Sequence, residues 1–491
     1  MDGSGNPWLK TDIGITGDRI AALGRLPDAK AKAVIDAGDR LVTPGFIDVH
    51  SHASEGLSRP ELRQAQPILA QGVTTVVINP DGGGPVDLAA QRLELEKGGV
   101  GPNVALLIGH GSVRSNVIGR DNRAPTPEEL EKMRALVRRA MEQGAYGLSS
   151  GLFYTPGSYS KTEEVIALAT VAGEFGGVYT SHIRDEGDYN IGVVAAVQEV
   201  IRIAEEGRLI GIVSHMKALG PDNWGLATAS TMRLEEARSR GVQVFADQYP
   251  YEASSTSLRA ALLPGGIELP DAADAVATLT PEKKAARQTL EATVRENMRR
   301  RGGAAAIQIA FFSPDPSLQG KTLAQIAETR KVAPEIAAID MMVKGNVSIV
   351  SFNMSEEDIR HIMRKPYTMV SSDGGLVRMD AGQPHPRNYG AFARRLALYV
   401  RERGVTTLEE AIRSMTSLPA SVFGLKDRGV IREGAAADIA IFDPAKIRDR
   451  ATYTQPHQLA EGMWGVLVNG VPVVSEGKFT AALPGRVSRK N

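Results

Sequence analysis

The chain contains no cysteine, and its charges cancel, with 57 lysines and arginines against 57 aspartates and glutamates. The lack of cysteine excludes disulfides, thiolate metal sites and a cysteine nucleophile. The lack of net charge excludes a nucleic-acid-binding protein held by a global positive field. We therefore expect no nucleic-acid partner.

Long hydrophobic runs are also missing. The longest apolar stretches, residues 73–78 and 439–442, are too short to cross a bilayer, and the first residues contain no hydrophobic region of a signal peptide. These absences predict a soluble, cytoplasmic protein with no membrane partner. The sequence gives no prediction of the oligomeric state.

What the chain does have is size and an ordinary globular composition. Its 491 residues are 42% hydrophobic and 23% charged, which is typical of a folded protein with a large core. At about 150 residues per domain, this length predicts two or three domains, or one large α/β barrel with appendages.

Short apolar runs followed by helical patterns recur through the middle of the chain. They lie at residues 72–79, 103–109, 144–149, 177–182, 209–215, 242–248 and 368–372. This alternation predicts parallel β/α units. The interval from about 258 to 367 is too long for one connection between such units, which predicts an inserted subdomain.

Two helix starts are marked by capping boxes. Thr126-Pro127-Glu128-Glu129 and Thr407-Leu408-Glu409-Glu410 both place a threonine before acidic residues in the first turn. The segment 281–302 is rich in charges of both signs, which favours a solvated helix face over a nucleic-acid patch.

Histidines stand where several of the apolar runs end. His50 and His52 are two residues apart, so on a strand both point to the same face. His182, His215 and Asp373 each follow another run, and the strand ends of a β/α barrel converge on one rim. Because imidazole and carboxylate are zinc ligands, the set predicts a divalent-metal site.

A lone histidine at a strand end is more often a hydrogen-bonded structural residue, so the prediction depends on the whole set. For His110 we favour a structural or supporting role. His361, His385 and His457 are predicted to be surface residues.

Longer motifs then carry a resemblance. The opening Val42 to Asp48 with His50 and His52, and the closing Gly429 to Ile439, resemble the metal-dependent amidohydrolase superfamily. More narrowly, the chain resembles the N-acyl-D-amino-acid deacylases, or D-aminoacylases. The matching segments are 147–152, 181–186, 214–217, 247–251, 254–256 and 372–374.

The resemblance implies an α/β fold with a TIM-like (β/α)8 barrel at residues 44–426. It also implies a small β-sandwich domain from residues 1–43 and 427–491, with the inserted subdomain at about 258–345. Relatives usually have a further strand before Asp2, so a truncated chain or a late start is one interpretation of this opening.

One departure from the family concerns a metal ligand. The segment after Gly72-Val73-Thr74-Thr75 normally offers a cysteine, whereas here it reads Asn79-Pro80-Asp81-Gly82. Asp81 is the expected substitute, because a carboxylate can ligate or bridge zinc. It is equally a common turn residue in a Pro-Asp-Gly sequence.

The implied reaction is hydrolysis of the amide bond of small N-acyl-D-amino acids by metal-activated hydroxide, with one or two zinc ions. By resemblance, His182, His215 and Asp81 form the tighter metal site, and His50, His52 and Asp373 form a second or weaker one. Asp373 is the expected general base and acid.

Such a substrate carries a free carboxylate beside the scissile amide. By resemblance, Lys217, Tyr249 and Ser255 bind this carboxylate and give the preference for the D-enantiomer. Arg184, Arg259 and Arg378 are candidates for an acidic side-chain pocket, or they are structural salt-bridge partners.

Three alternatives remain. A dipeptidase of the same superfamily is chemically close. A cyclic-amide hydrolase of the hydantoinase or dihydroorotase type generally carries a carboxylated lysine, and residues 145–154 contain no lysine. A non-catalytic barrel scaffold is disfavoured, because loss of catalysis would erode at least one of the five rim residues.

Overall fold

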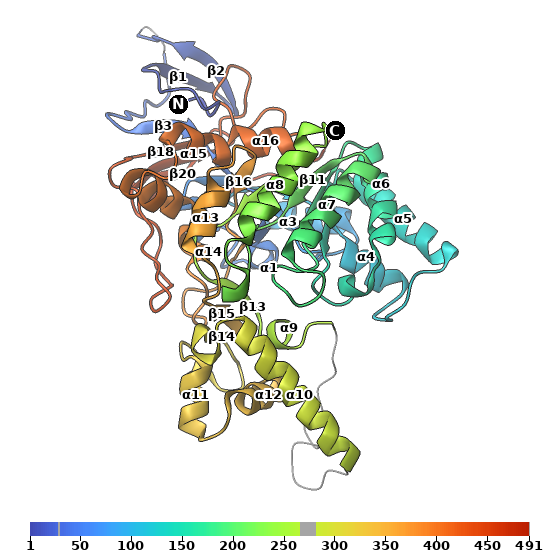
Figure 1. The fold of residues 1–491 in the computed structure, drawn as a ribbon. Helices are drawn as coiled ribbons and strands as arrows, with labels where there is room; N and C mark the ends of the chain where they lie inside the picture. The colour runs from blue at the N-terminus through green and yellow to red at the C-terminus, as the bar shows by residue number, and fades with distance from the viewer. Residues whose placement is uncertain (28–29, 266–280, 491) are drawn as a thin grey trace.

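A ring of parallel strands forms the centre of the molecule (Figure 1). The computed structural model describes residues 1–27, 30–265 and 281–490. In these residues the ring runs, in order, through β4 (Phe46–Asp48), β6 (Val73–Ile78), β7 (Asn103–Leu106), β8 (Ile108–Gly109), β9 (Gly147–Gly151), β10 (Val178–His182), β11 (Ile210–Val213), β12 (Val244–Gln248) and β16 (Thr368–Val370). Every apolar run expected to form a strand does so.

The ring closes through short extensions of its first and last strands. β5 (Ser51–His52) pairs in parallel with β17 (Gly374–Gly375), so the continuation of β4 lies beside that of β16. β7 and β8 are one strand interrupted at Leu107, whose N–H donates to the carbonyl of Ile78 at 3.2 Å. The carboxyl ends of all these strands therefore share one rim.

Helices cover the outside of the ring because each presents an apolar face to the strands. They are α1 (Ser54–Ser58), α2 (Gln66–Leu69), α3 (Leu88–Gly98), α4 (His110–Val117), α5 (Pro127–Glu142), α6 (Thr162–Glu174), α7 (Val193–Gly207), α8 (Leu226–Ser239), α13 (Glu356–Met363), α14 (Arg387–Arg394), α15 (Leu408–Met415) and α16 (Ser417–Phe423). Both predicted capping boxes are confirmed, at Thr126 and Thr407. A π-helical segment, Arg395–Glu402, continues α14.

The two ends of the chain meet in one antiparallel sheet beside the barrel. Its order is β21-β20-β19-β18-β3, so a strand from the N-terminal segment pairs with one from the C-terminal segment. The strands are β3 (Leu41–Pro44), β18 (Ile439–Phe442), β19 (Met463–Val468), β20 (Val471–Ser475) and β21 (Lys478–Phe479). A hairpin of β1 (Asp12–Thr16) and β2 (Arg19–Gly24) lies next to it, at the top of Figure 1.

The residues after β12 form a lobe with its own hydrophobic core, at the bottom of Figure 1. Its antiparallel sheet has the order β13-β15-β14, and the described helices of the lobe share one hydrophobic cluster with this sheet. The elements are β13 (Ser254–Ser257), α9 (Leu258–Leu262), α10 (Pro281–Arg300), β14 (Ile307–Phe311), α11 (Leu323–Arg330), α12 (Pro334–Lys344) and β15 (Ser348–Ser351). Residues 266–280 of the predicted insertion lie outside the described residues.

The α/β class with parallel barrel strands is confirmed. The domain boundaries at 43/44 and 426/427, and the limits 258–345 of the insertion, stay predictions. No helix in the described ranges combines the length and the apolar character that crossing a membrane requires.

Candidate active site

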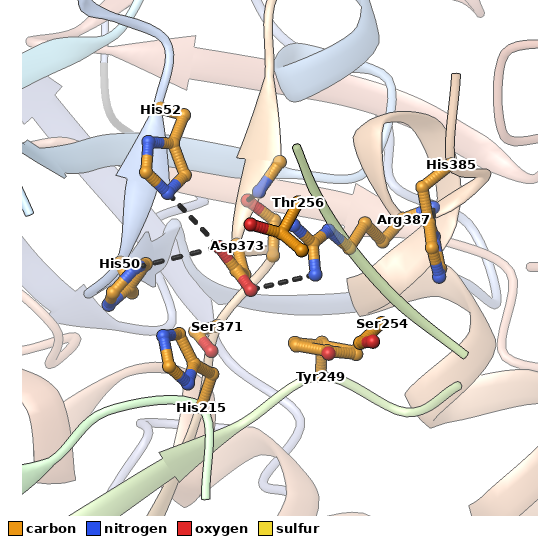
Figure 2. A network of polar contacts seen from close by, with 12 residues as sticks. His50, His52, His215, Tyr249, Ser254, Thr256, Ser371, Asp373, His385 and Arg387 are labelled. Atoms are coloured by element: carbon orange, nitrogen blue, oxygen red, sulfur yellow. Dashed lines mark hydrogen bonds and ion pairs between the residues drawn. The ribbon is translucent and has the colours of Figure 1, made fainter. Parts of the chain in front are cut away.

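Two histidines and two aspartates from three neighbouring strands face one another on the rim. His50 lies between β4 and β5, His52 ends β5, Asp81 follows β6, and Asp373 follows β16. The Nε2 atom of His52 lies 3.1 Å from Asp373 Oδ1 and 3.3 Å from Asp81 Oδ2. His50 Nε2 lies 3.5 Å and 3.4 Å from Oδ1 of the same two carboxylates. Figure 2 shows both imidazoles directed at Asp373.

A second group shares one of these carboxylates. His182 ends β10 and His215 follows β11, and their Nδ1 and Nε2 atoms are 2.9 Å apart. His215 Nε2 also lies 3.6 Å from Asp81 Oδ1. In each group the candidate ligand atoms lie within 4.8 Å of one another. Asp81 thus joins two sets of side chains, either of which has the composition of a metal site.

Several polar atoms at this place are buried and have no hydrogen-bond partner. In the described part of the chain they include His50 Nε2, His182 Nε2 and Asp81 Oδ1. Buried polar atoms are otherwise nearly always hydrogen-bonded, so these atoms need another partner. Imidazole nitrogen and carboxylate oxygen are the donors that zinc and similar ions take. The residues present therefore fit a divalent metal.

The backbone is strained at three of these positions. Asp81, His215 and Asp373 have φ values of 55°, 36° and 48°, in the left-handed region that side chains other than glycine rarely adopt. Such strain gathers at functional sites because the surrounding fold must hold it. Asp81 fits both interpretations of the sequence, the turn residue and the candidate metal ligand. Its backbone forms part of a turn, while its carboxylate faces the histidines.

The packing of opposite charges shifts several pKa values. Burial disfavours a charged imidazole at His52, but hydrogen bonds with Asp373 and Asp81 outweigh it and raise the pKa of His52 to about 9. Burial lowers the pKa of His182 to about 4. At Asp373 burial favours the neutral acid, but Arg387 and nearby histidines dominate and hold its pKa well below the ordinary value. Asp373 is therefore a carboxylate at neutral pH.

Two buried cations lie beside the cluster. Arg387 Nη1 lies 2.7 Å from Asp373 Oδ2, and its guanidinium carbon lies 4.7 Å from the ring centre of Tyr249. Lys217 Nζ lies 2.6 Å from His215 Nδ1 and also donates to Glu186. Figure 2 shows Arg387 reaching Asp373 from the side opposite the two histidines.

The other predicted substrate-binding residues are placed differently. Tyr249 follows β12 and is buried, and Ser255 lies half-buried in β13. Arg378 is exposed and donates to Asp380, with its Nη2 atom 2.6 Å from the carboxylate. Arg184 pairs with Glu199, which agrees with the salt-bridge interpretation. No observation tests the ligand and binding roles, which stay predictions.

Sequence reasoning missed Arg387, and it was wrong about a neighbouring histidine. His385 was expected at the surface, but it is buried, with Nε2 2.9 Å from the carbonyl of Ala253. Its Nδ1 accepts the backbone N–H of Arg387 at 3.0 Å, so the imidazole helps to fix the position of the Arg387 backbone. No strand pattern precedes either residue, so nothing local placed them on the rim. Glu186 lies in the quoted segment 181–186, four residues after His182, and this position was the only signal that the sequence offered for it.

Known proteins match the chain over nearly its full length. The model of the Amidohydrolase family matches residues 33–474. The curated N-acyl-D-glutamate deacylase of Alcaligenes xylosoxydans xylosoxydans is 35% identical, over 100% of this chain and 95% of that protein.

Two solved structures resemble this chain over nearly its full length. The N-acyl-D-glutamate deacylase of Bordetella bronchiseptica, crystallised with zinc and a phosphonate mimic of the tetrahedral intermediate, is 35% identical with a TM-score of 0.84. The match covers 99% of this chain and 97% of the Bordetella bronchiseptica chain. A D-aminoacylase described as having a binuclear metal centre is 32% identical with a TM-score of 0.83, with coverage of 99% and 97%.

Proposed function

The chain belongs to the amidohydrolase family, and from this premise we propose that it hydrolyses N-acyl-D-amino acids to a carboxylate and a free D-amino acid. The observation that carries the proposal is the shared position of Asp81 between two groups of imidazoles, beside the buried Arg387 and Lys217. Full-length relatives named for this reaction support it. The substrate is a small molecule.

We propose that the rim holds one or two zinc ions. The tighter set would be His182, His215 and Asp81, and the weaker set His50, His52 and Asp373. A divalent ion held there would make a water acidic enough to attack near neutral pH and would polarise the substrate carbonyl. A carboxylate in the cysteine's place keeps this centre free of sulfur, so the site does not depend on a thiol that oxidation would destroy.

Asp373 is the proposed general base and acid. Its Oδ1 atom faces the histidines, where a water would be activated, and its Oδ2 atom contacts Arg387. The guanidinium keeps this carboxyl deprotonated, so it can accept a proton from the attacking water. The same oxygen then delivers the proton to the departing amine, because the leaving nitrogen forms at the same place.

The cations beside Asp373 suit the α-carboxylate of the substrate. Arg387 Nε is buried and has no hydrogen-bond partner within the described residues, so a donor is left for a ligand. Lys217, Tyr249 and Ser255 are the predicted partners, although Lys217 already contacts Glu186. Fixed donors on one side of the amide would favour one enantiomer. The cytoplasmic location stays a prediction.

The test combines metal analysis with a substrate panel. Elemental analysis of protein purified without added metal should find about one or two equivalents of zinc, with less in Asp81→Ala. Asp81→Cys is the matched control, because a thiolate is also a zinc ligand, and it should retain metal. The panel contains N-acetyl-D-amino acids, their L-enantiomers, hydantoins and dipeptides.

Turnover of the D-series by the zinc-loaded protein supports the proposal. Turnover confined to the L-series, to cyclic amides or to dipeptides would overturn it. Absence of bound metal, with no activity on adding zinc, would turn the interpretation towards a barrel that binds without catalysing.

A further inference from the structure

A cavity of about 550 Å³ opens directly beside Asp81. It is walled by the loop after β6, by α4 and the turn that follows it, and by the loop after β9. The side chains that matter for its chemistry are Asp81, Ser112, Ser115, Asn116, Arg120 and Tyr154. Because Asp81 belongs both to the metal cluster and to the cavity wall, the cavity is continuous with the proposed reaction centre.

The cavity and the cation clamp lie over opposite parts of the strand ring. The cavity stands over β6, β8 and β9, whereas Lys217, Tyr249 and Arg387 come from segments after β11, β12 and β16. An amide has two arms, and the carboxylate is on the nitrogen arm. With the carboxylate held over β11, β12 and β16, the acyl arm extends towards β6, β8 and β9.

The backbone segments that form the walls pack closely together, and the side chains that line the cavity are largely polar. A Cβ at Gly151 would lie 2.3 Å from the carbonyl oxygen of Asp81, and one at Gly111 would lie 3.0 Å from that of Gly82. Glycine therefore lets these segments pack closely behind the cavity. Ser115 and Asn116 line it with polar side chains, and the Ser112 hydroxyl donates to the carbonyl of Gly84 at 2.6 Å, so this lining suits a polar occupant better than a hydrocarbon tail.

Arg120 is the cation of this cavity. It is exposed, and no ion pair or hydrogen bond of its guanidinium occurs among the described residues. Its neighbour Arg123 differs, because its Nη1 and Nη2 atoms donate to the two carboxylate oxygens of Glu129 at 2.7 Å each. An arginine without an acidic partner at a polar cavity is well placed to bind a carboxylate.

We propose that this cavity receives the acyl group and selects acyl chains ending in a second carboxylate, such as succinyl or glutaryl. The proposal rests on the proposed function and names its substrate class. In the reaction the amide C–N bond breaks, the water oxygen bonds to the acyl carbon, and a proton passes to the amine. The products are a dicarboxylate and a D-amino acid.

The test compares N-succinyl with N-butanoyl substrates, which match in chain length but differ in the terminal carboxylate. The D-amino acid is whichever gives the fastest N-acetyl turnover by the zinc-loaded protein. The wild type should prefer succinyl in kcat/KM by about tenfold or more, the range of a charge-assisted hydrogen bond. Arg120→Met should abolish this preference, and Arg120→Lys should retain part of it.

Two further variants sharpen the result. Arg25→Met removes an exposed arginine in the segment after β2 and should leave the succinyl preference unchanged. Ser115→Trp adds bulk to an exposed position of α4 that lines the cavity, and it should slow succinyl and butanoyl substrates more than acetyl ones. Circular dichroism and thermal unfolding confirm that each variant is folded.

The outcomes separate the inference from the proposed function. Hydrolysis of N-acetyl-D-amino acids with no succinyl preference, or with one that Arg120→Met retains, overturns the inference and leaves the function standing. If Arg120→Met instead impairs N-acetyl-D-glutamate relative to N-acetyl-D-norvaline, the cavity holds the amino-acid side chain and the acyl assignment is wrong. No turnover of any N-acyl-D-amino acid overturns both.

Discussion

Two buried polar networks in this molecule are built in opposite ways. On the rim, His50, His182, Asp81 and Arg387 all have buried polar atoms without hydrogen-bond partners in the described structure. At the junction between barrel and terminal sheet, Asp438, Asn103, Asn469 and Arg428 satisfy one another. The rim is incomplete by itself and the junction is complete.

The junction network links a barrel strand to the terminal sheet. Asp438 Oδ1 accepts the N–H of Asn469 at 2.7 Å, and its Oδ2 accepts from Asn103 Nδ2 at 3.1 Å and from Arg428. Asn469 Nδ2 donates to Asn103 Oδ1 at 2.8 Å. Every polar group that burial takes from water receives a protein partner, as stability requires.

The difference teaches how to separate function from stability among buried charges. A network whose polar atoms are all hydrogen-bonded stabilises the fold. A network with unpaired polar atoms can bind a ligand, but it lowers the free energy of unfolding until the ligand is bound. Mutations at the two places should therefore change different observables: activity at the rim and the free energy of unfolding at the junction.

The largest expected effect is at Asp373. Asp373→Asn keeps the shape of the side chain but cannot accept a proton at neutral pH, so kcat should fall by about a hundredfold to ten-thousandfold. Steady-state kinetics on an N-acetyl-D-amino acid measure this. Asp222→Asn, at an exposed aspartate paired with Arg299, is the control and should change kcat little. A normal kcat in Asp373→Asn would remove this residue from the mechanism.

The next effect concerns the junction. Asp438→Asn removes the buried charge partner of Arg428, whose own side chain is 10% exposed, and breaking such a pair costs about 3–5 kcal/mol in the free energy of unfolding. Urea denaturation measures the loss. Glu461→Gln, in the exposed pair with Arg448, should cost less than about 1 kcal/mol. Equal losses in both variants would contradict the contrast between networks.

Metal should stabilise the rim without affecting the junction. At a free zinc concentration about 100 times Kd, binding to the folded state adds about 2.7 kcal/mol. Thermal unfolding with zinc and with a chelator should therefore differ by several degrees in the wild type. The increment should be the same in Asp438→Asn, because distant sites act additively. A zinc shift that survives His182→Ala combined with Asp81→Ala would place the ion elsewhere.

The smallest effect is a pH dependence at a third network, between α4 and α6. Glu164 accepts from Arg114 Nη1 at 2.5 Å and pairs with His110 Nε2 at 2.9 Å. Burial opposes its charge, but these two partners outweigh burial and lower its pKa below the ordinary 4.5. The carboxylate therefore contributes stability above pH 4.5, and this contribution is lost as pH falls through the lowered pKa.

Protonation of Glu164 at low pH should therefore lower the free energy of unfolding. Urea denaturation of the wild type and of Glu164→Gln from pH 7 to pH 3 measures it. The difference between the two proteins should shrink as the pH falls. A constant difference would mean that the Glu164 charge does not contribute.

The sequence predicted the strands and five of the candidate metal ligands because both are local signals, and the family resemblance added Asp81. An apolar run of five or six residues predicts a buried strand, and where such strands alternate with helices in a barrel, the residues that follow them reach one rim. His50, His52, Asp81, His182, His215 and Asp373 all follow or end such runs, and the structure brings them together. The family prediction is confirmed by the match over residues 33–474.

Arg387, His385 and the Lys217–Glu186 contact were decided by packing alone. They stand in loops or at a helix start, where the chain returns to the rim through contacts with segments far away in sequence. The position of Arg120 at a cavity shared with Asp81 has the same origin. The sequence alone determined which side chains end the strands. Only the tertiary structure decided which charged side chains meet across the barrel and which are left without partners. These contacts join residues far apart in the chain, so no repeating sequence pattern predicts them.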